Sequence, residues 1–176
     1  MSSGITFKLS NGVIIPGLGF GTFASEGSKG ETYRAVVKAL QVGYRFLDCA
    51  WFYKNEQEVG DGIRDFLKAN PSVKRRDIFV ATKVWNHMHR YEDVLWSFNN
   101  SRERLQLEYI DMFLIHWPIA AEKEDNEEPK IGSDGKVKSS CSSFESFFLC
   151  FIAIAADLFL CHLKPVRYPE RPDREP

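Results

Sequence analysis

The chain has 176 residues, of which 44% are hydrophobic and 27% are charged, and its formal net charge at pH 7 is -1. This composition describes a globular chain long enough for one core, and the balanced charge gives no basic excess of the kind that favours nucleic-acid binding. The first residues lack the charged segment and apolar run of a secretory signal. Four cysteines without metal-ligand or disulfide spacing predict reduced thiols, no metal site and a cytoplasmic location.

The first predicted elements are a β-hairpin and a short strand. Asn11-Gly12 separates two short segments, 6–10 and 13–16, and predicts a two-residue type I′ turn because both residues tolerate positive φ. Residues 18–22 form the next predicted strand. Its glycines leave room either for a flat ligand near the backbone or for a tight packing bend.

Three amphipathic helices then alternate with three apolar runs. The first helix is predicted to begin at a capping box that starts at Ser28 and to end at Gly43. The second begins at Asn55 and stops before Pro71, and the third covers about 91–105. The apolar runs are 45–47, 78–83 and 112–116. This alternation is typical of a parallel sheet built from βαβ units.

Each apolar run ends at a titratable side chain, and a tyrosine follows the first of them. These residues are Asp48, Lys83 and His116, with Tyr53 five positions after Asp48. Parallel strands place their carboxyl ends on one rim, where α/β enzymes carry their chemistry. The Asp48 and Tyr53 pair alone would also fit a helix cap beside a packed ring. Three consecutive strands with such ends favour a catalytic site.

Over about residues 5–136 the sequence resembles the aldo-keto reductase superfamily. The residues that carry the resemblance are Gly19-Phe-Gly-Thr-Phe23, Gly43-Tyr-Arg-Phe-Leu-Asp-Cys-Ala-Trp-Phe-Tyr53 with Asn55-Glu56, Thr82-Lys-Val-Trp85 and Asp111-Met-Phe-Leu-Ile-His-Trp-Pro118. The resemblance implies an α/β fold, a partial (β/α)8 TIM barrel with about the first four β/α units and the hairpin as a plug at its base. It also implies a catalytic tetrad. The four positions are Asp48, Tyr53, Lys83 and His116.

The resemblance implies an oxidoreductase that reduces an aldehyde or ketone, a small sugar-like or aliphatic carbonyl, to the alcohol with NADPH. Tyr53 would give the proton, and the Lys83 ammonium would favour its release because it stabilises the phenolate. Asp48 would hold Lys83 charged, and neutral His116 would orient the carbonyl. Expected substrate contacts are Phe23, Phe52, Trp85, His116 and Trp117. Each of these aromatic side chains could instead pack in the core. Expected cofactor contacts are Gly21, Thr22 and Asp48.

The sequence departs from the family after the fourth strand. Residues 120–135 are charged and turn-rich, and they fit either a loop that closes the substrate pocket or a solvated linker. We assign residues 1–138 to a truncated barrel domain and 139–176 to a tail outside the family. A complete barrel needs about 250 residues. In the family the second half holds most of the cofactor, so we expect the truncation to impair activity and leave NADP or NAD preference open.

The tail is apolar at 147–163 and then rich in Pro and Arg. Three explanations are open: a gene-model or splicing artefact, a helix that packs on the sheet, and a membrane anchor. Seventeen helical residues span about 25 Å, less than the roughly 30 Å of a hydrocarbon core, and Asp157 near the middle argues further against an anchor. The basic residues 164–167 lack a strand context for phosphate binding. The alternative function is a non-catalytic fragment that self-associates through open sheet edges or pairs with a full-length relative.

Overall fold

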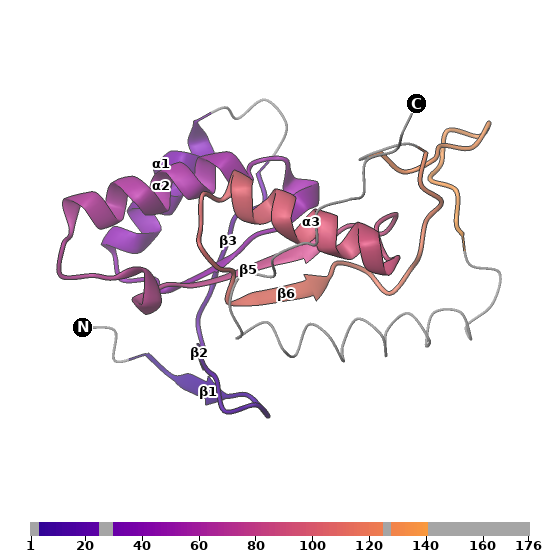
Figure 1. Ribbon diagram of the computed structural model, residues 1–176. Coiled ribbons are helices and arrows are strands. Elements are labelled where there is room, and N and C mark those ends of the chain that lie inside the picture. The colour runs from indigo at the N-terminus through magenta and orange to yellow at the C-terminus, as the bar shows by residue number, and fades with distance from the viewer. Residues whose placement is uncertain (1–3, 25–29, 125–127, 141–176) are drawn as a thin grey trace, which may run out of the picture.

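The structure is a computed structural model, and it describes residues 4–24, 30–124 and 128–140. Its main sheet has four parallel strands in chain order, and a separate antiparallel hairpin precedes them. The three helices lie along one side of the main sheet, and the hairpin lies apart from them (Figure 1). This is the predicted partial barrel of α/β type. Of the predicted tail 139–176, all but residues 139 and 140 lie outside the described residues, including 147–163 and 164–167.

The hairpin consists of β1 (Thr6–Lys8) and β2 (Ile14–Pro16). The predicted two-residue type I′ turn is wrong. Gly12 N–H donates to the Leu9 carbonyl at 2.9 Å, and Gly12 has φ 88° whereas Asn11 does not have positive φ. The Asn11 side chain instead accepts a hydrogen bond from Val13 N–H at 3.1 Å. A longer turn with glycine in the left-handed region therefore joins the strands, as in hairpins with one extra loop residue.

The main sheet contains β3 (Phe20–Gly21), β4 (Phe46–Asp48), β5 (Phe79–Val84) and β6 (Met112–Ile115). The pairs β3–β4, β4–β5 and β5–β6 are all parallel. Each of the three predicted apolar runs forms a strand within one or two residues of its predicted bounds. The strand predicted at 18–22 is present but shortened to two residues.

The helices are α1 (Glu31–Gln41), α2 (Glu56–Ala69) and α3 (Tyr91–Arg104). Their predicted positions are confirmed, but the start of α1 differs from the prediction. Ser28 lies outside the described residues, and the residue that precedes α1 is Gly30, with φ 80°. The N–H groups of Gly30 and Tyr33 donate to the two carboxylate oxygens of Glu58, at 2.9 and 3.2 Å. A side chain of α2 thus satisfies donors that a helix start leaves without a partner inside the helix.

The core fills the space between the helices and the main sheet. Apolar positions that repeat along α1 and α2 face strand residues that are inaccessible to solvent. The residues of this cluster with no more than 1% exposure are Val36, Leu40, Leu47, Cys49, Val59, Ile63, Ile78, Val80 and Leu105. Glycine permits the closest helix contact, because a Cβ at Gly60 would lie 2.4 Å from the Leu105 carbonyl oxygen. This packing holds the strand ends in fixed relative positions.

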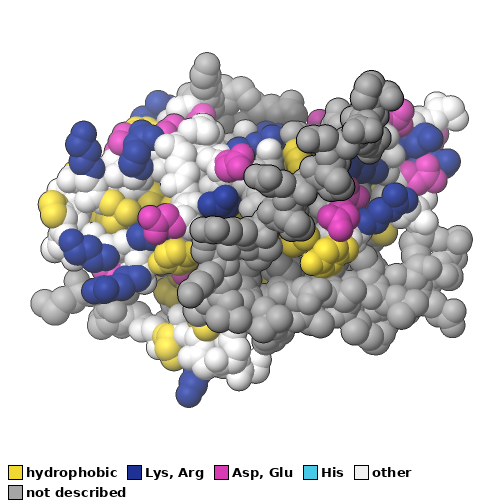
Figure 2. Space-filling model, in the orientation of Figure 1, with side chains coloured by type: hydrophobic (Ala, Val, Ile, Leu, Met, Phe, Trp, Pro, Cys, Tyr) yellow, Lys and Arg dark blue, Asp and Glu magenta, His cyan; other side chains and the backbone are white. Residues whose placement is uncertain are grey.

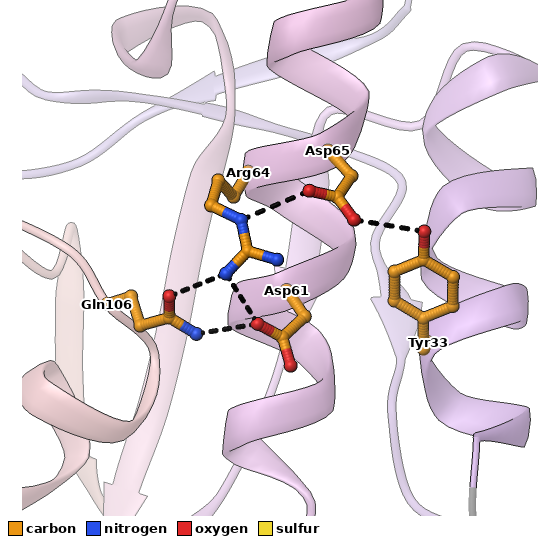
Figure 3. A network of polar contacts seen from close by, with 5 residues as sticks. All are labelled: Tyr33, Asp61, Arg64, Asp65 and Gln106. Atoms are coloured by element: carbon orange, nitrogen blue, oxygen red, sulfur yellow. Dashed lines mark hydrogen bonds and ion pairs between the residues drawn. The ribbon is translucent and has the colours of Figure 1, made fainter.

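A solvent-exposed polar network joins α1, α2 and the segment after α3 (Figure 3). The Tyr33 hydroxyl donates to Asp65 at 3.1 Å, and Arg64 donates to both Asp65 and Asp61. Gln106, which has φ 56°, exchanges hydrogen bonds of 2.8 Å with Arg64 and Asp61. Exposed ion pairs contribute little to stability. The network lies on the solvent-facing surface of the helices.

The segment after β6 folds back on itself. Isolated antiparallel bridges pair Ala121 with Ser139, Lys123 with Pro129 and Ile131 with Val137. Lys123 also forms a 2.6 Å ion pair with Asp93 of α3, and Glu128 lies 3.7 Å from Lys54. The charged side chains on the face shown in Figure 2 are of both signs and interspersed. In the described part of the chain, no helix is long and apolar enough to cross a membrane.

Candidate active site

Three strand ends and one short helix bring the four predicted catalytic residues together. Asp48 is the last residue of β4, Lys83 lies near the end of β5, and His116 directly follows β6. Tyr53 ends the 3-10 helix η1 (Trp51–Tyr53), which follows β4. Because neighbouring parallel strands run in the same direction, these ends share one rim of the sheet.

The Lys83 ammonium is the centre of the cluster. Its Nζ donates to Asp48 Oδ1 at 2.7 Å, to the Cys49 carbonyl oxygen at 2.8 Å and to the Tyr53 hydroxyl oxygen at 3.4 Å. The Lys83 side chain is 14% exposed, and the Asp48 side chain is 40% exposed. The distance between Tyr53 and Lys83 is shorter than the limit of about 4 to 6 Å within which a charge acts strongly on an acid. The ammonium is therefore placed to stabilise negative charge on the Tyr53 oxygen.

His116 lies against the tyrosine ring on the other side of the cluster. The His116 and Tyr53 rings meet edge to face with 5.6 Å between centroids. Partial burial lowers the pKa of His116 and the Lys83 ammonium lowers it further, while Asp48 acts in the opposite direction. The imidazole is therefore neutral at pH 7. Its Nδ1 atom is buried and has no hydrogen-bond partner among the residues that the structure describes.

The predicted aromatic residues surround this pair. Phe52 stacks on Trp85 at 3.9 Å between centroids, Trp85 meets His116 at 4.9 Å, and Phe23 meets Tyr53 at 5.2 Å. Trp117 stacks on His116 at 6.2 Å. The fractional exposures of Phe23, Phe52 and Trp117 are 66%, 44% and 52%. Rings this exposed are not core residues, and an exposed aromatic surface beside polar groups is typical of a small-molecule site.

The residues predicted to contact a cofactor differ in what they offer. A Cβ at Gly21 would meet no atom within 4 Å, whereas a Cβ at Gly19 would lie 2.9 Å from the Phe46 ring. Gly19 is therefore a packing position, and the backbone at Gly21 is open to a ligand. The Thr22 side chain is buried, and its hydroxyl donates to the Asp48 carbonyl at 3.1 Å. The Thr22 side chain holds β4 in place and does not extend toward solvent.

Several residues that support the site were not assigned a role from the sequence. The amide of Asn55 donates to the Thr22 carbonyl at 2.7 Å, and Thr82 donates to Glu56 at 2.6 Å. The adjacent Cys49 is fully buried, which raises its pKa to about 12 and makes it chemically inert. The signal in the sequence was the pair Asn55-Glu56, two residues after the predicted catalytic tyrosine. Among residues 4–24, 30–124 and 128–140, no three His, Cys, Asp or Glu side chains are grouped to hold a metal ion.

Comparisons with known proteins identify the family to which the chain is similar. The model of the Aldo/keto reductase family matches residues 17–148. Glycerol 2-dehydrogenase (NADP(+)) from Hypocrea jecorina is 64% identical over 131 residues, which are 74% of this chain and 41% of that protein. D/L-glyceraldehyde reductase from the same organism is 46% identical over 68% of this chain and 36% of its own length. The match extends beyond residue 138, where we placed the end of the barrel domain, and that boundary stays a prediction.

A solved structure shows the same relationship in three dimensions. The aldose reductase from Schistosoma japonicum superimposes with a TM-score of 0.72 at 34% sequence identity, over 87% of this chain and 50% of that one. This chain thus spans half or less of the length of these relatives. The family model covers most of the chain, and the parallel strands, helices and strand-end residues have the order that the resemblance implied. The chain belongs to the aldo/keto reductase family.

Proposed function

We propose that the site reduces a small aldehyde or ketone, sugar-like or aliphatic, to the alcohol with NADPH. The observation that carries the proposal is the Lys83 ammonium, which lies 2.7 Å from Asp48 and 3.4 Å from the Tyr53 hydroxyl. An acid, a cation that stabilises its conjugate base and a carboxylate that holds the cation are thereby assembled at one rim. The names of the two fungal relatives, a glycerol dehydrogenase and a glyceraldehyde reductase, support a small polyol or aldehyde as the substrate class.

Tyr53 is the proposed proton donor. When its proton moves to the carbonyl oxygen of the substrate, negative charge develops on the phenol oxygen beside Lys83. The ammonium stabilises that charge, and Asp48 keeps the ammonium in position by a short charge-assisted hydrogen bond. Because Lys83 is largely buried, its charge is less screened by water than that of a surface lysine.

His116 and the aromatic rings position the carbonyl. A neutral imidazole can donate one hydrogen bond to the substrate oxygen without adding a second positive charge beside Lys83. The lowered pKa of His116 favours that neutral form. Phe52 and Trp85 stack in parallel and present a flat apolar surface next to the imidazole. Such a surface accepts the carbon chain of the substrate while the polar groups bind its oxygen.

The residues at the end of β3 and β4 fit a flat cofactor ring. Gly21 offers open backbone, and Asp48 is partly exposed beside it in the paired register of the two strands. We propose that Gly21, the Thr22 backbone and Asp48 lie against the nicotinamide end of NADPH. Bound NADPH supplies the hydride that reduces the carbonyl carbon. The name of the related glycerol 2-dehydrogenase includes NADP(+), which supports the choice of cofactor. The name of the related D/L-glyceraldehyde reductase supports the choice of reaction.

The test is to measure NADPH binding by fluorescence and aldehyde-dependent NADPH oxidation with the purified chain. A Tyr53→Phe variant removes the proton donor and keeps the ring, so it should bind NADPH as the wild type does and lose turnover. In the family the second half holds much of the cofactor, so we expect the 176-residue chain to bind NADPH at millimolar, not micromolar, concentration, a loss of about 4 kcal/mol. Turnover that is equal in wild type and Tyr53→Phe would contradict the proposal.

A second candidate is a non-catalytic chain that pairs with a second copy of itself or with a full-length relative. Within the described residues, β3 and β6 each pair on one side only, and Leu114 of β6 is 41% exposed. Open parallel edges with exposed apolar side chains favour association. Light scattering distinguishes the candidates: a monomer with Tyr53-dependent turnover supports the enzyme, and an inactive oligomer supports the fragment.

We also propose that the protein acts in the cytoplasm. Cys49, the cysteine that the structure describes, is a free buried thiol. Free thiols are usual in reducing compartments. Fractionation of cells that express a tagged chain tests this location.

A further inference from the structure

Glu56 is a buried carboxyl group whose position is not explained by its helix alone. It begins α2, only 2% of it is exposed, and it lies in the layer between the helices and the sheet. The hydroxyl of Thr82, a fully buried residue of β5, donates to Glu56 Oε1 at 2.6 Å. A buried carboxyl costs free energy even when it is bonded, and an apolar side chain would give comparable or greater stability. The residue therefore points to a role other than stability.

The Glu56–Thr82 hydrogen bond joins the two segments that carry the proton donor and the cation. Thr82 immediately precedes Lys83, and because side chains alternate along a strand the two point to opposite faces of the sheet. On the other side, Glu56 follows Tyr53 by three residues. Two residues separate them, and the first of these, Lys54, is held to η1 by a hydrogen bond from its N–H to the Trp51 carbonyl at 3.2 Å. A displacement of Glu56 would therefore move Tyr53.

A second hydrogen bond, made by Asn55, also holds the segment that contains Tyr53 and Glu56. Asn55 holds the segment to the end of β3 through the Thr22 carbonyl at 2.7 Å. Glu56 holds it to β5, the strand of Lys83. The Tyr53–Lys83 contact at 3.4 Å is the longest of the three that Lys83 makes, so it is the contact that a small shift would break first.

We infer that Glu56 is a positioning residue which, through Thr82, sets the distance between the Tyr53 hydroxyl and the Lys83 ammonium; this rests on the proposed function of that pair. Burial raises the pKa of Glu56, and the Thr82 hydrogen bond opposes the rise. A neutral carboxyl and the amide of glutamine have nearly the same shape and acceptor oxygen. Glu56→Gln should therefore preserve the hydrogen bond to Thr82, whereas Glu56→Leu or Thr82→Val should remove it.

The decisive variant replaces both partners at once. Removing one partner leaves the other buried without a hydrogen bond, which destabilises the fold, whereas replacing both with apolar groups of similar shape is nearly neutral. The double variant therefore carries Glu56→Leu and Thr82→Val in the same chain. Glu56→Gln and Thr82→Ser are the conservative single variants. Glu58→Ala is the matched control, since Glu58 is also a carboxylate of α2 with a tertiary hydrogen bond but bonds to α1.

Two readouts are needed so that the inference can be tested separately from the proposed activity. The first is kcat and KM for aldehyde reduction per folded molecule. The second is the ionisation midpoint of Tyr53, obtained as the difference in tyrosinate absorbance between each variant and the same variant with Tyr53→Phe, because the chain has 6 tyrosines. The second readout needs neither cofactor nor turnover, so it remains informative if the chain is not a reductase.

The double variant should remain folded, lose about tenfold to about a hundredfold in kcat with little change in KM, and ionise Tyr53 at higher pH. Glu56→Gln should retain most of the wild-type kcat. Glu58→Ala should lower stability without moving the Tyr53 midpoint. A double variant that folds with wild-type kcat and a wild-type midpoint would overturn the inference. If the wild type shows no turnover but the midpoint shifts as expected, the proposed function fails and the positioning role stands.

Discussion

Substituting Lys83 with methionine should lower turnover strongly, although less than Tyr53→Phe, which removes the proton donor itself. Methionine keeps most of the aliphatic stem and removes the ammonium, which lies 3.4 Å from the Tyr53 hydroxyl oxygen. Two unit charges at this distance attract by about 5 kcal/mol at an effective dielectric constant of about 20, and by about 1 kcal/mol in bulk water. With the Lys83 side chain 14% exposed, the site is nearer the first condition.

Proton transfer from the Tyr53 phenol is only partly complete in the transition state. With about half of the charge developed, the ammonium contributes about 2.5 kcal/mol, which corresponds to roughly a fiftyfold to hundredfold loss of kcat. The assay is aldehyde-dependent NADPH oxidation under saturating conditions, normalised to folded protein by circular dichroism. Tyr53→Phe sets the background rate.

The control is Lys68→Met, which also removes one positive charge. Lys68 is an exposed lysine in the last turn of α2. Its kcat should equal that of the wild type. If Lys83→Met retained a kcat within about threefold of wild type, the electrostatic effect at 3.4 Å would be no larger than that expected in bulk water, and our account of the site would be wrong.

Three further predictions concern other parts of the structure. Gly21→Ala should fold normally, since its Cβ meets no atom within 4 Å, and should weaken NADPH binding because the methyl group occupies the open backbone; unchanged affinity would place the cofactor elsewhere. His89, whose pKa burial lowers to about 4, takes up fewer protons folded than unfolded below about pH 6.5. Stability should thus fall by about 2 kcal/mol from pH 7 to pH 5, and His89→Asn should flatten this slope in urea titrations. Asp111→Ala removes the acceptor for Arg75 at 2.7 Å and for Val80 N–H at 2.9 Å, and should cost about 3 kcal/mol in urea unfolding. A loss below about 1 kcal/mol would show that this pair behaves as an exposed one.

The sequence alone predicted the order and type of the main elements. Apolar periodicity and chain breakers such as Pro71 are local properties, so the strands that end near Asp48, Lys83 and His116 and the helices, apart from the start of α1, lie within one or two residues of their predicted bounds. The tetrad was also accessible from the sequence. The rule that parallel strands align their carboxyl ends converts three separate strand ends into one site without any distance being known.

The details that differ from the sequence predictions all depend on atoms far apart in the chain or on a choice between local alternatives. Glu58 of α2 satisfies the first turn of α1, which no pattern near Gly30 could indicate. The turn after β1 follows from the Asn11 side chain, which binds Val13 N–H instead of leaving both turn residues in positive φ. Local sequence permitted both turns, and the pairing of the strands selected one.

Tertiary structure also decided which of the predicted site residues are open to a ligand. Gly19 and Gly21 are equivalent in the sequence, but the Phe46 ring fills the space at one and leaves it open at the other. The Thr22 hydroxyl is used within the fold, and the Glu56–Thr82 hydrogen bond links residues 26 positions apart. Side chains compete for the same space and the same hydrogen-bond partners only when distant segments meet, so these assignments depend on packing. The residue types came from the sequence, and the 3.4 Å distance between Tyr53 and Lys83 came from the fold.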